Sequence, residues 1–120
     1  MRQTALFDGG VTAARRNARP EAAALREVLM TLRGHPAVAW AERQNSGAYK
    51  DGGRFIRYGW PGCSDILGQL RDGRFLAVEV KAPRGLLRPE QALFLERVRA
   101  AGGLAFVARN AADVLHGIEG

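Results

Sequence analysis

The tripeptide Glu79-Val80-Lys81 carries a carboxylate and an ammonium two residues apart in an apolar segment that is typical of a β-strand. Because side chains alternate along a strand, Glu79 and Lys81 are predicted to share one face, while Leu76, Val78 and Val80 share the other. A solvated strand face with an incidental ion pair fits the tripeptide equally well, since exposed pairs contribute little. The pair becomes a candidate catalytic site only if a second acid joins it.

Asp65 supplies that acid if the hairpin around residues 71–74 has the right register. A two-residue loop would pair Asp65 with Val80 and put the two carboxylates on opposite faces. A three-residue loop, 71–73, with Gly73 in the left-handed conformation, pairs Asp65 with Glu79 instead, and hairpins of this kind commonly end in glycine. We predict the three-residue loop. Two neighbouring carboxylates would then bind a hard cation such as Mg²⁺ or Mn²⁺.

Two further polar residues interrupt apolar helical stripes. Glu21 falls within the stripe of one predicted helix, and Gln91 falls within the stripe of another. A polar group that faces a core needs a partner, because leaving it unsatisfied costs roughly 1–3 kcal/mol. A first-turn acid favoured by the helix dipole explains Glu21 as well, and a boundary position explains Gln91. Both residues are candidate site residues.

A polar segment and a basic, aromatic one lie between the first strand and Asp65. Arg43, Asn45 and Ser46 have side chains that can hydrogen-bond phosphate, although an ordinary turn explains the segment too. Downstream, basic residues alternate with aromatic ones, a combination that grips phosphates and stacks on bases. Core packing explains some of these aromatic residues equally well. The candidate nucleic-acid contacts downstream are Lys50, Arg54 and Arg57, interleaved with Tyr49, Phe55, Tyr58 and Trp60.

Hydrophobic periodicity predicts the elements that position these residues. A helix is expected to start at Pro20 and to end before Gly34, and a second helix is expected to start at Pro89. Val38 and Trp40 are expected on one face of the first strand. The strands are predicted at 38–43, 54–58, 64–70, 75–81 and 104–109, with a loop at 45–53, a turn at 59–62 and a last short helix after Asn110. This order predicts an α/β domain with one mixed central sheet.

Length and composition indicate one domain. The chain has 120 residues, of which we assign 1–18 to a flexible basic arm and 19–120 to a single domain. A net charge of +6 points to a polyanionic partner. Only two of the 18 basic residues, Lys50 and Lys81, are lysine, which suggests positions where a compact ammonium is needed.

A single cysteine, Cys63, cannot form an internal disulfide, so a reducing cytoplasm is expected. With His35 and His116 far away in the sequence, Cys63 also makes a poor zinc site. No apolar run approaches the roughly 20 residues that span a bilayer, so no membrane partner is expected.

The chain contains four short motifs, Arg43-x-Asn45-Ser46-Gly47, Gly62-x-x-Asp65-Ile66, Glu79-Val80-Lys81 and Pro89-Glu90-Gln91. In this order and spacing they resemble the VRR-NUC (virus-type replication-repair nuclease) domain of the PD-(D/E)XK nuclease superfamily. The resemblance runs from about residue 21 to residue 107. The chain is similar to the stand-alone phage or bacterial type, since it lacks the additional domains of large eukaryotic members.

The resemblance implies a restriction-endonuclease-like αβββαβ core and a role for each site residue. Asp65 and Glu79 would bind the metal together with the backbone carbonyl of Val80. Lys81 would orient the attacking water and stabilise charge on the phosphate. Two residues match assisting positions of the family, namely Glu21 on the first helix and Gln91 on the second. The chain departs from the family at Arg88, where a Ser or Thr helix cap is expected.

The implied function is a metal-dependent DNA endonuclease that hydrolyses phosphodiester bonds by attack of water, with Mg²⁺ or Mn²⁺ as cofactor. Relatives make four-way junctions and flaps the expected substrates, within DNA repair or recombination. A homodimer would supply two active sites for paired cuts. The cytoplasm of a bacterium or a phage-infected cell is the expected location. The alternatives are a non-catalytic basic module that binds nucleic acid or assembles with partners, and a hydrolase of RNA or nucleotides.

Overall fold

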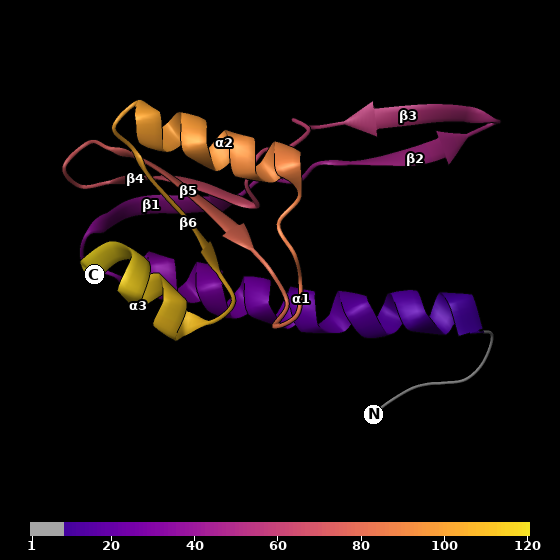
Figure 1. Cartoon of the computed structure of the whole chain (residues 1–120), viewed down its shortest axis with the longest axis horizontal. Coiled ribbons are helices and arrows are strands. Elements are labelled where there is room, and N and C mark those ends of the chain that lie inside the picture. Colours follow the sequence, from indigo (N-terminus) through magenta and orange to yellow (C-terminus); the bar gives the residue numbers. More distant parts are fainter. Residues whose placement is uncertain (1–8) are drawn as a thin grey trace.

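A mixed four-stranded sheet lies between helices in the computed structural model, which describes residues 9–120, with side chains from residue 20 onward. Helix α2 covers one face of the sheet, and α1 and α3 cover the other (Figure 1). The elements are α1 (Gly9–Gly34), β1 (Val38–Arg43), β2 (Gly47–Asp51), β3 (Arg54–Tyr58), β4 (Ile66–Leu70), β5 (Phe75–Val80), α2 (Pro89–Ala100), β6 (Leu104–Ala108) and α3 (Ala111–Glu119). No helix within residues 9–120 combines the length and the apolar character that crossing a membrane requires.

The strands of the main sheet follow the order β1-β4-β5-β6. β1 and β5 both pair antiparallel with β4, whereas β6 pairs parallel with β5 after the crossover through α2. A parallel neighbour requires such a crossover, and a helix of this length provides it. The predicted mixed sheet is confirmed, and the architecture is that of a restriction-endonuclease-like core.

The turn between β4 and β5 sets the register of the site. Ile66 pairs with Val78, the N–H of Leu70 donates to the carbonyl of Arg74 at 2.9 Å, and the N–H of Gly73 donates to the Leu70 carbonyl at 2.9 Å. Gly73 has a φ of 98°, the left-handed conformation that glycine adopts without steric penalty. The predicted three-residue loop is confirmed.

Strand β5 separates two apolar clusters by the alternation of its side chains. Leu76, Val78 and Val80 pack with α1 and α3 on one side of the sheet. Ala77 faces the other side, where a second cluster contains Ala105 and three residues of α2, namely Phe94, Leu95 and Val98. Small side chains on β5 and β6 let the helix pack closely over this face. Further along β5, the same face carries Glu79 and Lys81, so the predicted division of the two faces is confirmed.

Helix α1 begins earlier than the sequence predicted. Its first residue is Gly9, and Pro20 lies inside the helix, so the prediction that Pro20 opens the helix is wrong. Residues 9–18 of the expected flexible arm are therefore helical, and residues 1–8 of it lie outside the described residues. The alanines between 13 and 18 have the highest helix propensity, which favours continuation across the proline despite one lost hydrogen bond.

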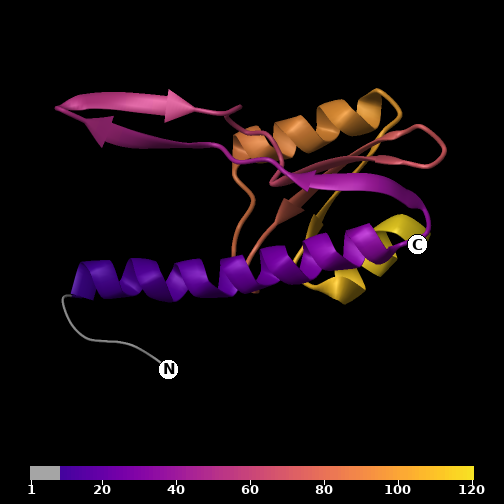
Figure 2. The same ribbon diagram turned by 180° about the vertical axis from the view of Figure 1, so that it is seen from behind.

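Two predictions for the strand region also differ from the structure. A β-bulge between Val38 and Trp40 shifts the register of β1, so Val38 is buried while Trp40 is exposed, and the two do not share a face. In addition, most of the predicted loop at 45–53 forms strand β2. It pairs with β3, which was predicted as a strand, in a separate two-stranded sheet that projects beyond the main sheet (Figures 1 and 2).

Candidate active site

Two acids and one amine converge where β4 and β5 meet the N-terminal end of α2. Continuing the β4–β5 ladder by one residue places Asp65 opposite Glu79, and their carboxyl groups lie within hydrogen-bonding reach of each other. The Nζ atom of Lys81 lies 3.5 Å from the Oε2 atom of Glu79. The geometry on which the sequence argument depended is therefore present.

The side chain of Asp65 takes the place of one main-chain hydrogen-bond partner between β4 and β5. Hydrogen-bonded pairs recur at every second residue of an antiparallel ladder, and after Leu70–Arg74 and Ile66–Val78 the next such pair would join Ser64 to Val80. Instead, the N–H of Val80 donates to the Oδ2 atom of Asp65 at 2.8 Å. The strands thus part at this point, and a carboxylate is held in the fork.

The backbone of Asp65 is fixed from its other side by the end of β1. The N–H of Gln44 donates to the carbonyl oxygen of Asp65 at 2.7 Å. Asp65 is therefore held by its carbonyl to the chain after β1 and by its side chain to β5. A carboxylate held at two points loses little further freedom when a ligand binds, which is the property that a catalytic site requires.

Glu79 is a buried acid with incomplete hydrogen bonding. It is only 2% exposed, and its Oε1 atom has no hydrogen-bond partner among the described residues. Burial, the negative charge of Asp65 and the hydrogen bond with Asp65 together raise the pKa of Glu79 to about 8, although Lys81 opposes the shift. Two ionised carboxylates would carry more negative charge than the one ammonium offsets, so Glu79 stays mainly protonated at neutral pH in the metal-free protein.

A pH-dependent stability follows for the metal-free protein. The pKa of Glu79 is about 8 in the folded chain and 4.5 as its ordinary value, so the folded state holds more protons between these limits. The stabilisation that Glu79 contributes is therefore fully present below pH 4.5. It declines as pH rises through about 8, by up to about 1.4 kcal/mol per pH unit. Urea unfolding in EDTA across this range measures the decline, and Glu79→Gln should flatten it. A slope in the variant equal to that of the wild type would contradict the assignment to Glu79.

A polar cavity of about 490 Å³ opens beside Asp65. It gathers residues from α1, the end of β1, the base of the β2–β3 hairpin and the start of α2. Glu79 and Lys81 do not line the cavity, because they are buried, with exposed fractions of 2% and 8%. Lys50 and Arg54 lie outside it on the hairpin. The predicted site residues that line the cavity are Glu21, Arg43, Asn45, Ser46, Arg57, Asp65 and Gln91.

Three of these residues have surroundings that the sequence did not reveal. Glu21 is exposed at the cavity wall rather than turned into the core. Gln91 accepts a hydrogen bond through Oε1 from the N–H of Arg88 at 2.9 Å and so caps α2 while it lines the cavity. The Oγ atom of Ser46 accepts from the N–H of Trp60 at 2.9 Å and donates to the Trp60 carbonyl at 3.3 Å. No three His, Cys, Asp or Glu side chains cluster within the described residues, so Glu21 stays apart from the pair of acids.

Arg88 and Tyr58 also line the cavity. Tyr58 was predicted only as one of the aromatic residues among the basic ones, and Arg88 was not predicted as a site residue. The signal for Arg88 was its position before Pro89, where it has no acceptor group to cap the helix. Cys63 lies on the same wall, and burial together with the charges of Glu79 and Asp65 raises the pKa of its thiol to about 11. The thiol is thus protonated and unreactive at neutral pH.

The mixed sheet with helices on both faces and an Asp65/Glu79/Lys81 set at the parted strands define a nuclease-like α/β core. The family model of the VRR-NUC domain matches residues 17–112, and the chain belongs to this family. A search of curated protein sequences finds no match. VRR-NUC domains are nucleases of the PD-(D/E)XK type, so the chain is a nuclease domain whose substrate is DNA. Nucleases of this type generally use divalent metal ions.

Proposed function

We propose that this domain is a metal-dependent DNA endonuclease in which Asp65 and Glu79 hold a divalent cation and Lys81 assists the attack of water on the phosphodiester bond. One observation carries the proposal: two carboxyl groups and an ammonium meet at the parted ends of β4 and β5, and one buried carboxyl oxygen has no partner among the described residues. A protein domain that binds nucleic acid without cleaving it does not require this arrangement.

The donor set fits Mg²⁺ or Mn²⁺. Both ions prefer oxygen ligands, and a bound cation would satisfy the Oε1 atom of Glu79 and offset the repulsion that raises the pKa of this acid. Val80 donates its N–H toward Asp65, and a residue in an antiparallel ladder directs its N–H and its C=O to the same neighbour. The Val80 carbonyl, on the same side of β5, would then supply a third oxygen ligand. Glu21 is the candidate for an assisting acid at the cavity wall.

When bound, the cation lowers the pKa of water and neutralises charge on the phosphate. The residues of the chain position the water and the phosphates. Lys81 offers a compact ammonium with three N–H donors beside the acids, which suits it to orient water and to stabilise charge that develops on the phosphate. Arg43 and Arg57 on the cavity wall, with Asn45, are suited to hold the phosphates on either side of the cut. Gln91 keeps the first turn of α2 in place next to them.

Branched DNA, namely four-way junctions or flaps, is the substrate that we infer within this class. A homodimer would present two such sites for paired cuts, as in DNA repair or recombination, and the cytoplasm of a bacterial or phage-infected cell is the inferred location. The net charge of +6 supports a polyanionic substrate. Three arginines, Arg43, Arg57 and Arg88, line the cavity together with three acids, so they offer phosphate contacts beside the acids that would hold the cation.

Incubation of the purified protein with linear, flap and four-way-junction DNA, each with Mg²⁺, with Mn²⁺ and with EDTA, tests the proposal. We expect cleavage with either ion, none in EDTA and a preference for branched DNA. A parallel set of RNA substrates separates DNA from RNA cleavage. Salt-sensitive binding without cleavage under any of these conditions would favour a non-catalytic binding module instead.

A further inference from the structure

The β2–β3 hairpin, residues 47–58 and here called the hairpin arm, extends away from the main sheet on the same side as the N-terminal half of α1 (Figures 1 and 2). Every residue of β2 is exposed, and in β3 only Ile56 is half-buried. An isolated two-stranded hairpin is marginally stable in water. An arm with two uncovered faces is suited to bind a ligand.

Its two faces differ in chemistry. Tyr49 pairs with Ile56, and the rings of Tyr49 and Tyr58 lie 6.2 Å apart, so these three side chains form an aromatic face. Lys50 pairs with Phe55 on the opposite face, where the guanidinium of Arg57 lies 5.3 Å from the centre of the Phe55 ring. This second face is cationic. The arm thus offers two tyrosine rings on one face, with the Asp51–Arg54 pair at its tip, and two cations beside the Phe55 ring on the other face.

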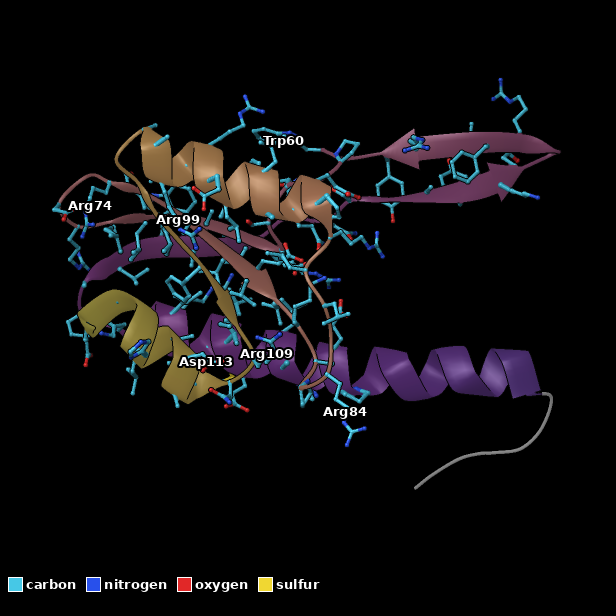
Figure 3. The ribbon with its side chains drawn as sticks, viewed as in Figure 1. Trp60, Arg74, Arg84, Arg99, Arg109 and Asp113 are labelled. Atoms are coloured by element: carbon cyan, nitrogen blue, oxygen red, sulfur yellow. The ribbon has the colours of Figure 1, made fainter. Side chains whose placement is uncertain are left out.

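The base of the arm is tied to the candidate active site. Ser46 and Trp60, which flank the arm, exchange the two hydrogen bonds described above. The Trp60 ring in turn packs edge-on against Phe94 of α2, with ring centres 5.1 Å apart, and Figure 3 shows Trp60 beside this helix. Arg57 and Tyr58 line the cavity that contains Asp65. A strand bound in the cavity is therefore led directly onto the arm.

We propose that the hairpin arm binds unpaired nucleotides next to the scissile phosphate, with its aromatic face stacked on the bases and its cationic face against phosphates. This inference rests on the proposed function, in which a DNA strand occupies the cavity. Charge complementarity supports it, because residues 47–58 contain three basic residues and one acid. The exposed rings favour an unpaired strand over a duplex, because the bases of a continuous duplex already stack on one another. The two rings of the aromatic face, Tyr49 and Tyr58, are 53% and 45% exposed.

Binding measured in EDTA tests the arm without requiring cleavage. Fluorescence anisotropy compares a labelled duplex with the same duplex extended by two unpaired arms, for the wild type, Tyr49→Ala and Tyr49→Phe. We expect Tyr49→Ala to weaken binding of the forked DNA by about tenfold, as loss of one stacked base predicts, and to leave binding of the duplex unchanged. Tyr49→Phe should retain the affinity of the wild type. Trp40→Ala, which removes an equally exposed ring that does not line the cavity, is the matched control.

Equal losses on both DNAs, or no loss on either, would overturn the proposal. So would a Tyr49→Ala protein that changes from dimer to monomer in sedimentation while its DNA affinity is unchanged, because the arm would then be a contact between copies. Lys50→Ala gives an independent test from the other face and should weaken forked DNA more than duplex. If the fork preference depends on Tyr49 but no metal supports cleavage, the arm assignment stands and the nuclease mechanism fails. If the protein cleaves DNA but its binding to forked DNA does not depend on Tyr49, the nuclease mechanism stands and the arm assignment fails.

Discussion

Replacement of Lys81 by methionine should slow DNA cleavage by about 10²- to 10³-fold while DNA affinity in EDTA stays that of the wild type. Methionine keeps an apolar stem of similar length, so the packing at this buried position survives while the charge is lost. Lys81 is only 8% exposed and does not line the cavity, so it contributes little to the initial capture of DNA. Single-turnover cleavage of labelled branched DNA at saturating metal measures the rate, and anisotropy in EDTA measures affinity.

The pH dependence of this variant separates two roles for the amine. Lys81 lowers the pKa of Glu79, so its removal should raise that pKa further. If Lys81 acts only by keeping Glu79 ionised, higher pH or higher metal concentration should restore cleavage. If it acts on water or phosphate, the rate should stay low at every pH. Arg97→Met, a change at an exposed basic residue of α2, is the control and should cut at the rate of the wild type. A wild-type rate in Lys81→Met at neutral pH would refute both roles.

The register of the site was predictable because a local feature decides it. Gly73 can adopt the left-handed conformation that a three-residue loop requires, and that loop length alone fixes which residue faces Asp65. The alternation along β5 is equally local, and it correctly assigned Glu79 and Lys81 to one face. Neither inference needed knowledge of distant parts of the chain.

The wrong sequence predictions concern residues whose environment depends on distant contacts or on how deeply the residue is buried. Periodicity gives the direction in which Glu21 points from its helix, but not how far the sheet extends beneath it, and the sheet leaves this residue at a cavity wall. The bulge in β1 inserts one residue and so reverses the face predicted for Trp40. Strand β2 has both faces exposed, so it shows no alternation of apolar and polar residues and was read as a loop.

Hydrogen bonds in the structure give two of the predicted site residues a structural role in addition to the predicted one. Gln91 was singled out as a polar residue on an apolar stripe, with a boundary position as the alternative, and it both caps α2 and lines the cavity. Ser46 was singled out as a phosphate contact, and its hydroxyl ties together the two ends of the hairpin arm. Ser46 and Trp60 are far apart in the sequence, so composition and spacing could not reveal the hydrogen bonds between them.

Asp65→Asn should abolish detectable Mn²⁺ binding and slow cleavage by about 10³-fold while it makes the metal-free protein more stable near neutral pH. The asparagine oxygen can still accept the hydrogen bond from the Val80 N–H, so the fork between the strands is kept. Removal of the negative charge should lower the pKa of Glu79, because that charge is one of the causes of its increase. Less stability is then lost as pH rises, which is the sign expected when repulsion between two acids is relieved.

Asp65→Ala is the matched comparison, since it removes both the charge and the acceptor. It should lose metal binding as Asp65→Asn does, but it should also lose roughly 1–3 kcal/mol of stability through the unsatisfied Val80 N–H. Isothermal titration with Mn²⁺ and urea unfolding in EDTA at two pH values distinguish the variants. A gain in stability with a loss of metal binding is typical of residues kept for chemistry rather than for folding. An Asp65→Asn protein that is less stable at neutral pH and still binds Mn²⁺ would mark the carboxylate as a structural cap of the β4–β5 fork.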